Sequence, residues 1–186
     1  MRNEIIEVLV RSWWGIAAIV GGGCWAVKSL AILTTGDQPD YLFELAPIAL
    51  ATATLGLVLT WHREYRSSRL PVGLGAVALV SASLASVSYI VQGDDEGLFG
   101  LTLMIAMLSI IALLFWVGRP LWRTREGEQW RAIPYPLGWA FIVAMPLGGL
   151  LSALNERLLE IPLLAISIGW IWLGIAWIAT TSHVKG

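Results

Sequence analysis

The sequence predicts an all-α membrane protein that crosses the bilayer six times, as three αα-hairpins with both termini in the cytoplasm. Three observations predict this class: six long apolar stretches, few charged residues, and a charge that alternates in sign between the stretches. Apolar residues make up 57% of the 186 positions and charged residues 13%, whereas an ordinary soluble domain has about 25% charged residues. Too few polar residues are present to coat a soluble protein. We therefore expect a single membrane domain over residues 1–186.

Each apolar stretch is long enough to span a bilayer. A helix rises about 1.5 Å per residue, so about 20 residues cross a hydrocarbon core of about 30 Å. The first stretch exceeds the apolar core of a signal peptide and is followed by five more, which predicts a retained helix. The predicted spans are 12–33, 42–61, 70–92, 97–118, 135–154 and 158–179.

The charges predict the orientation. All but two of the 12 Lys and Arg residues fall on one side of the membrane, the exceptions being Lys28 and Arg157. Because cytoplasmic segments are enriched in Lys and Arg, this basic side is predicted to be cytoplasmic. The predicted location is the inner or plasma membrane of a bacterial or archaeal cell, with multiple passes.

Tryptophans gather at the same ends of the predicted spans. The indole ring is apolar but carries one N–H donor, so it is favoured at the depth of the lipid headgroups. The sequence thus predicts a cytoplasmic tryptophan belt formed by Trp13, Trp14, Trp61, Trp116, Trp122, Trp130, Trp139 and Trp177.

Small residues spaced by four form stripes along the odd-numbered spans. In lipid no hydrophobic force drives helices together, so close approach along small residues becomes a main source of association. We expect the first, third and fifth spans to form the packed interior and the fourth, rich in Leu, Ile and Met, to face lipid. The predicted packing residues are Ala18, Gly22 and Ala26, then Ala78, Ala82 and Ser86, then Ala140, Ala144, Gly148 and Ser152.

Three groups of residues are candidates for a polar or ligand site. Lys28 in the first span is predicted either to pair with Glu44 beneath the acidic outer turns or simply to extend its ammonium group towards the outer surface. Ser81, Ser88 and Gln92 share a face of the third span, which either lines a polar path or bonds to backbone and neighbouring helices. Trp170 and Trp172 in the last span are candidates for the wall of a pocket.

Motifs with a defined chemistry are absent from the sequence. It contains neither an HExxH zinc motif nor a P-loop lysine motif, and no residue pair offers a nucleophile and a base. We therefore predict a protein that is not an enzyme, with no catalytic residue, no cofactor and no metal. Anionic lipid headgroups account for the basic segments, so no nucleic acid is expected. The expected partners are the bilayer and either a second copy or another membrane protein.

The layout resembles the HdeD-like family of small bacterial membrane proteins. That resemblance implies six helices and a role linked to acid or envelope stress, and it transfers no catalytic residue. It covers nearly the whole chain and rests on Arg11, Trp14 and Gly15 opening the first span, Pro71 and Gly73 opening the third, and the basic residues after Trp61 and Trp116.

Two functions follow from these patterns. The first is a non-enzymatic integral membrane protein, stress-linked or serving as an accessory or assembly component. The second is a small-molecule transport component with a site between helices. A pocket that contains Trp170 or Trp172 and opens outward would favour transport. A filled interior with an apolar ladder on the surface would favour assembly.

Overall fold

The computed structural model describes the backbone of residues 2–39, 42–65, 69–92, 97–124 and 128–182, and the side chains of 12–39, 45–65, 69–91, 97–124 and 128–180. Within these residues the chain is almost entirely helical and contains no strand. The long helices are α1 (Arg2–Thr34), α2 (Leu42–Tyr65), α3 (Leu70–Gln92), α4 (Leu98–Arg123), α5 (Pro134–Ser152) and α6 (Glu160–Ser182). Two short 3₁₀ helices, η1 (Gln129–Ala132) and η2 (Glu156–Leu159), precede α5 and α6.

All six long helices are sufficiently long and apolar to cross a membrane. This confirms the predicted class, a multi-pass protein of the cell membrane. Four helices run at least three residues past the predicted spans: α1 begins at Arg2, α2 ends at Tyr65, α4 ends at Arg123 and α6 ends at Ser182. Hydropathy marks how far the hydrocarbon layer extends, whereas a helix continues into the polar headgroup region until the backbone is capped or broken.

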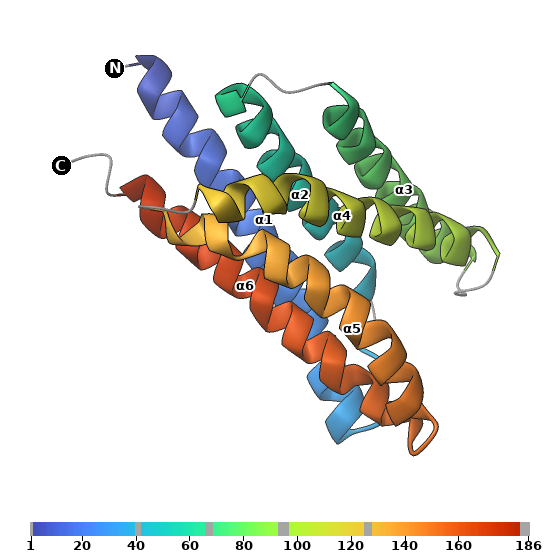
Figure 1. The fold of residues 1–186 in the computed structure, drawn as a ribbon. Helices are drawn as coiled ribbons and strands as arrows, with labels where there is room; N and C mark the ends of the chain where they lie inside the picture. The colour runs from blue at the N-terminus through green and yellow to red at the C-terminus, as the bar shows by residue number, and fades with distance from the viewer. Residues whose placement is uncertain (1, 40–41, 66–68, 93–96, 125–127, 183–186) are drawn as a thin grey trace.

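The helices pack as a ring in which each contacts the next along the chain, and α6 closes the ring against α1. Figure 1 shows both termini at one end of the bundle, with α6 packed against both α1 and α5 and α4 crossing between α3 and α5. The end that holds Arg63, Arg119 and Arg131 is named the basic end here. The opposite end, with Asp37 and Glu156, is named the acidic end.

The most extensive contact in the bundle joins α1 to α6, which lie at opposite ends of the sequence. It exceeds the contact between α5 and α6, although those two helices form a predicted hairpin. Glycines explain the difference: a Cβ atom added to Gly22 would lie 2.7 Å from the Ser167 carbonyl oxygen, and one added to Gly15 would lie 3.0 Å from that of Gly174. The two backbones are therefore in direct contact.

The expectation that α4 faces lipid is wrong. Ile110, Leu113 and Leu114 are fully buried, and α4 packs against α2, α3 and α5. Only its other face, with Met104 and Leu108, is exposed. Large apolar side chains are equally at home in lipid and in a packed interior, so their abundance does not predict which way a membrane helix turns.

The small-residue stripes lie at contacts between helices. Seven of the ten predicted packing residues are buried, whereas Ala26, Ala140 and Ser152 are half-buried. The odd-numbered helices nevertheless do not form a separate interior, because the stripes contact the even-numbered helices on either side. The fraction of residues buried inside the protein is smallest in the span that contains α5 and largest in the span that contains α2, an even-numbered helix.

The eight tryptophans predicted at the basic end divide into three exposed, two buried and three half-buried residues, the last being Trp14, Trp61 and Trp122. Trp13, Trp116 and Trp139 are exposed, as a belt at headgroup depth requires. Trp130 and Trp177 are buried and stack face to face with their ring centroids 5.0 Å apart. These two rings belong to the core rather than to the belt, because η1 folds Trp130 back onto α6.

Candidate functional site

A buried ion pair joins α1 to α6 near the acidic end. The Lys28 Nζ atom donates to the Glu160 Oε1 atom at 2.9 Å. The Ser29 hydroxyl donates to the other carboxylate oxygen, Oε2, at 2.7 Å. Lys28 is only 9% exposed and Glu160 only 4%. These three residues are named the α1–α6 clamp.

The local sequence places each member of the clamp. Lys28 and Ser29 are adjacent in the last third of α1, and Glu160 is the first residue of α6, directly after η2. A carboxylate in the first turn of a helix lies at the positive end of the helix dipole. The start of α6 is therefore a favourable position for the negative charge that Lys28 requires.

Lys28 is thus buried against Glu160, a partner that the sequence did not predict, and the expectation that its ammonium group simply extends towards the outer surface is wrong. The predicted partner, Glu44, lies in the first turn of α2, and its side chain falls outside the described side chains. Pairing between Lys28 and Glu44 stays a prediction.

A second network of charged and aromatic residues closes the basic end. The Arg131 guanidinium bonds to Glu128 and to Glu64, the latter at 3.0 Å. It also lies 5.3 Å from the centroid of the Trp130 ring and donates to the Tyr65 hydroxyl at 3.3 Å. Since Glu64 and Tyr65 end α2 while Arg131 belongs to η1, this network ties α2 to the segment before α5.

The predicted polar face of α3 lies elsewhere in the bundle. Ser81 and Ser88 are buried on a helix that packs against α2 and α4, whereas the clamp lies between α1 and α6. The Gln92 side chain is outside the described side chains. The structure therefore brings Ser81 and Ser88 into the protein interior but does not join them to Lys28.

Trp170 and Trp172 point in different directions. Trp170 is fully buried, and its indole Nε1 has no hydrogen-bond partner among the described residues. Trp172 is 63% exposed. Side chains two positions apart on a helix point to roughly opposite sides, so only Trp170 contributes to the core.

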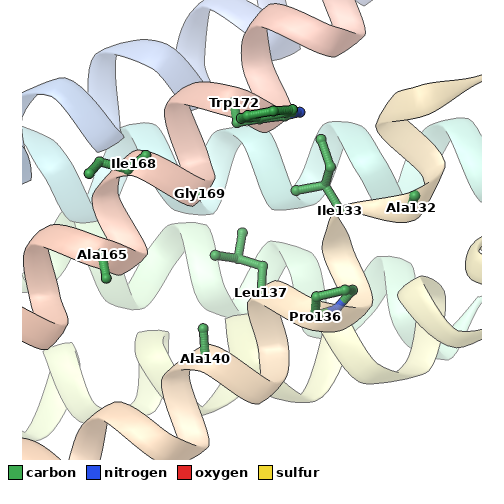
Figure 2. A pocket seen from close by; sticks show the side chains of 9 residues that line it. All are labelled: Ala132, Ile133, Pro136, Leu137, Ala140, Ala165, Ile168, Gly169 and Trp172. Carbon is green, nitrogen blue, oxygen red and sulfur yellow. The ribbon is translucent and has the colours of Figure 1, made fainter.

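Trp172 forms one wall of an apolar groove between α5 and α6. The groove encloses about 300 Å³. Figure 2 shows Ile168 and Trp172 on α6, and across the groove Ile133, which directly precedes α5, and Leu137 on α5. The Leu137 side chain points into the groove. The groove is lined by Ala132, Ile133, Pro136, Leu137, Ala140, Ala165, Ile168, Gly169 and Trp172. Apart from the Trp172 indole N–H, no lining side chain can hydrogen-bond, so the groove suits hydrocarbon rather than a polar solute.

Comparisons with known proteins give one similarity. The chain is 32% identical over 171 residues to the ESX-3 secretion system protein EccD3 of Mycobacterium tuberculosis, equally in strains H37Rv and CDC 1551. The alignment covers 85% of this chain and 32% of EccD3. The chain thus spans about a third of the length of the curated relatives it matches. No family model and no solved structure matches, and the resemblance to the HdeD-like family stays a prediction.

Sequence reasoning missed Glu160 and the role of Arg131. For Glu160 a signal existed: Lys28, Glu44 and Glu160 are the only charged residues inside the six predicted spans. A lone lysine at that depth favours a buried carboxylate, but the sequence does not choose between two glutamates. For Arg131 no signal existed, because a basic residue beside the membrane is expected from orientation alone.

Proposed function

We propose that this protein is an accessory or assembly component of a membrane-embedded secretion apparatus, with no enzymatic activity of its own. The observation that carries the proposal is the similarity to EccD3, a secretion system protein, over 85% of the chain. A membrane subunit of this kind holds a fixed shape in the bilayer and offers its outer helix faces to other subunits.

The packing of the interior supports this function. Trp130, Trp170 and Trp177 are among the largest fully buried side chains, so bulky rings fill part of the interior between the helices. The buried charged groups of the clamp contact each other across two helices. Such groups hold helices in place rather than face a substrate.

The outer surface supports the same proposal. Exposed Val, Leu and Ile side chains run along α1, α3, α4, α5 and α6, among them Val80, Val87 and Val91 on α3. An apolar surface of this kind faces lipid and also serves for packing against other membrane helices. This is the filled interior with an outer apolar ladder that favours assembly.

A small-molecule transport component is the alternative function. The α5–α6 groove contains Trp172, one of the two tryptophans expected in a transport pocket. Its lining is apolar, and the buried hydroxyls of Ser81 and Ser88 belong to another helix. A polar solute in the groove would leave its hydrogen-bonding groups unsatisfied, so the groove supports transport less well.

Purification from native membranes in mild detergent tests the proposal. We expect the 20.3 kDa chain to elute in a larger complex, and mass spectrometry to identify secretion system proteins within it. An unrelated six-helix protein with the same tag is the control for detergent aggregation. Recovery of the chain alone with a bound small molecule would favour transport instead.

Deletion of the gene separates the stress-linked role that the HdeD-like resemblance implies from the secretion role. Loss of secretion with unchanged survival in acid is the result expected for a secretion component. Reduced survival in acid with normal secretion would favour the stress-linked role.

A further inference from the structure

A notch at the basic end lies between α4 and the start of α5. It encloses about 450 Å³, within the range of sites that hold small molecules. Five of its six lining residues are apolar or aromatic, and the sixth is an arginine: Ala112, Phe115, Trp116, Arg119, Pro120 and Tyr135.

The walls of the notch are held by a close helix crossing. A Cβ atom added to Gly118 would lie 2.7 Å from the backbone nitrogen of Tyr135, so only glycine permits the start of α5 to lie this close to α4. The Phe115 and Tyr135 rings then meet edge to face, 5.8 Å apart. Trp139 contacts both rings, at 5.2 and 6.5 Å. The notch is therefore an open hollow with one wall of packed aromatic rings.

The lining residues change from apolar to charged along α4. Ala112 and Trp116 precede Arg119 by about two turns and one turn, and all three are exposed. Trp116 belongs to the exposed tryptophans of the basic end, where indole rings lie at headgroup depth. Arg119, nearer the end of the helix, then lies at the depth of the lipid phosphates.

The charge of Arg119 distinguishes it from Arg131 at the same end. Arg131 contacts the carboxylates of Glu64 and Glu128. Among the described side chains, no carboxylate within ion-pair distance of Arg119 is recorded. A planar guanidinium beside an apolar wall matches a phosphate group joined to hydrocarbon.

We infer that this notch binds one anionic phospholipid of the bilayer. Arg119 contacts the phosphate, and the acyl chain lies along Ala112 and Trp116 towards the membrane interior. The site goes beyond the proposed assembly function and does not depend on it, since a bound lipid serves any membrane protein of this fold.

Native mass spectrometry of the purified full chain tests the inference, with phosphatidylglycerol and phosphatidylcholine as the two lipid probes. The wild-type protein is expected to bind one phosphatidylglycerol more tightly than phosphatidylcholine. Arg119→Gln is expected to lower the phosphatidylglycerol affinity about fivefold, the effect of one cationic side chain near a membrane surface. Arg63→Gln, which removes another exposed arginine of the same end outside the notch, is the matched control and should change nothing.

A second variant tests the apolar wall without changing the charge. Ala112→Trp adds a ring to an exposed position on α4 and should reduce the number of tightly bound lipids from one to none. Equal binding by Arg119→Gln and Arg63→Gln would overturn the inference. The inference would also be overturned if Arg119→Gln lost a companion protein and kept its lipid, because the notch would then bind protein.

Discussion

At the scale of single residues, the account depends on how two charges are accommodated between helices. Burying an ammonium or carboxylate group costs several kcal/mol unless an opposite charge and hydrogen bonds compensate. In the clamp, Lys28 supplies the charge and Ser29 supplies a hydrogen bond to the second oxygen of Glu160. The pair therefore specifies which faces of α1 and α6 meet, more than it adds to stability.

Substitutions in the clamp test this interpretation. Lys28→Met leaves a buried carboxylate without its cation and should lower the free energy of unfolding by about 3–5 kcal/mol. The double variant Lys28→Met/Glu160→Leu removes both charges and should recover most of that loss. Unfolding in mild detergent, followed by circular dichroism, measures all three proteins.

Glu160→Gln is the control within the same site, because its amide oxygen still accepts from Lys28 and its amide N–H can donate to the Ser29 hydroxyl while the charge is lost. The free energy of unfolding of Glu160→Gln should lie between that of the wild type and that of Lys28→Met. Losses that simply add in the double variant would show that the two side chains are not energetically coupled.

The sequence singled out Lys28 as an unusual charge within a span, but it predicted neither its burial nor its partner Glu160. The two residues are 132 positions apart, and Glu44 and Glu160 are both at the start of an apolar span. Only the contact between α1 and α6 places Glu160 beside Lys28. The hydroxyls of Ser81 and Ser88 could also be picked out from the sequence. They lie far from Lys28 because α3 packs against α2 and α4, whereas Lys28 lies between α1 and α6.

At the scale of helices, glycines determine where the backbones meet. Gly15 and Gly174 lie opposite each other, and a Cβ atom on Gly174 would lie 3.0 Å from the Ile19 backbone nitrogen. Gly149, by contrast, has no atom within 4 Å of its added Cβ. The same residue type is thus a contact point on α6 and a lipid-facing position on α5.

Leucine substitutions at these two glycines should separate the two roles. Gly174→Leu forces α1 and α6 apart, and we expect a loss larger than the 1–3 kcal/mol typical of overpacking because the clash is with backbone. Gly149→Leu should be tolerated. Size-exclusion chromatography after a temperature series measures the stability of each variant, and equal melting of the two would contradict the close α1–α6 contact.

The element scale also shows why helix positions were predicted and helix packing was not. A run of about 20 apolar residues identifies a span because a polar backbone must be satisfied within lipid. The same apolar residues have no preference between lipid and protein interior. Hence the sequence predicts that Ile110 and Leu113 face lipid, although both are fully buried. Ile111 on the same helix is only 6% exposed, so Ile111→Ala would lower the free energy of unfolding.

At the scale of the whole molecule, the charges divide the bundle into a basic and an acidic end. At the basic end Arg131 pairs with Glu64 and Glu128, and Arg119 lines the notch between α4 and α5. The acidic end carries Asp37, Glu156 and the clamp beneath them. This division, together with six apolar helices, was readable from the sequence because it depends on composition and order rather than on contacts.

The orientation across the bilayer tests the account most directly. Single cysteines replace exposed residues at the acidic end (Asp37, Asn155) or at the basic end (Arg63, Arg123) in a Cys24→Ala background, and intact cells are treated with a membrane-impermeant maleimide. We predict labelling at 37 and 155 in intact cells, and at 63 and 123 only after permeabilisation. Labelling of 63 and 123 from outside, with 37 and 155 protected, would contradict the account.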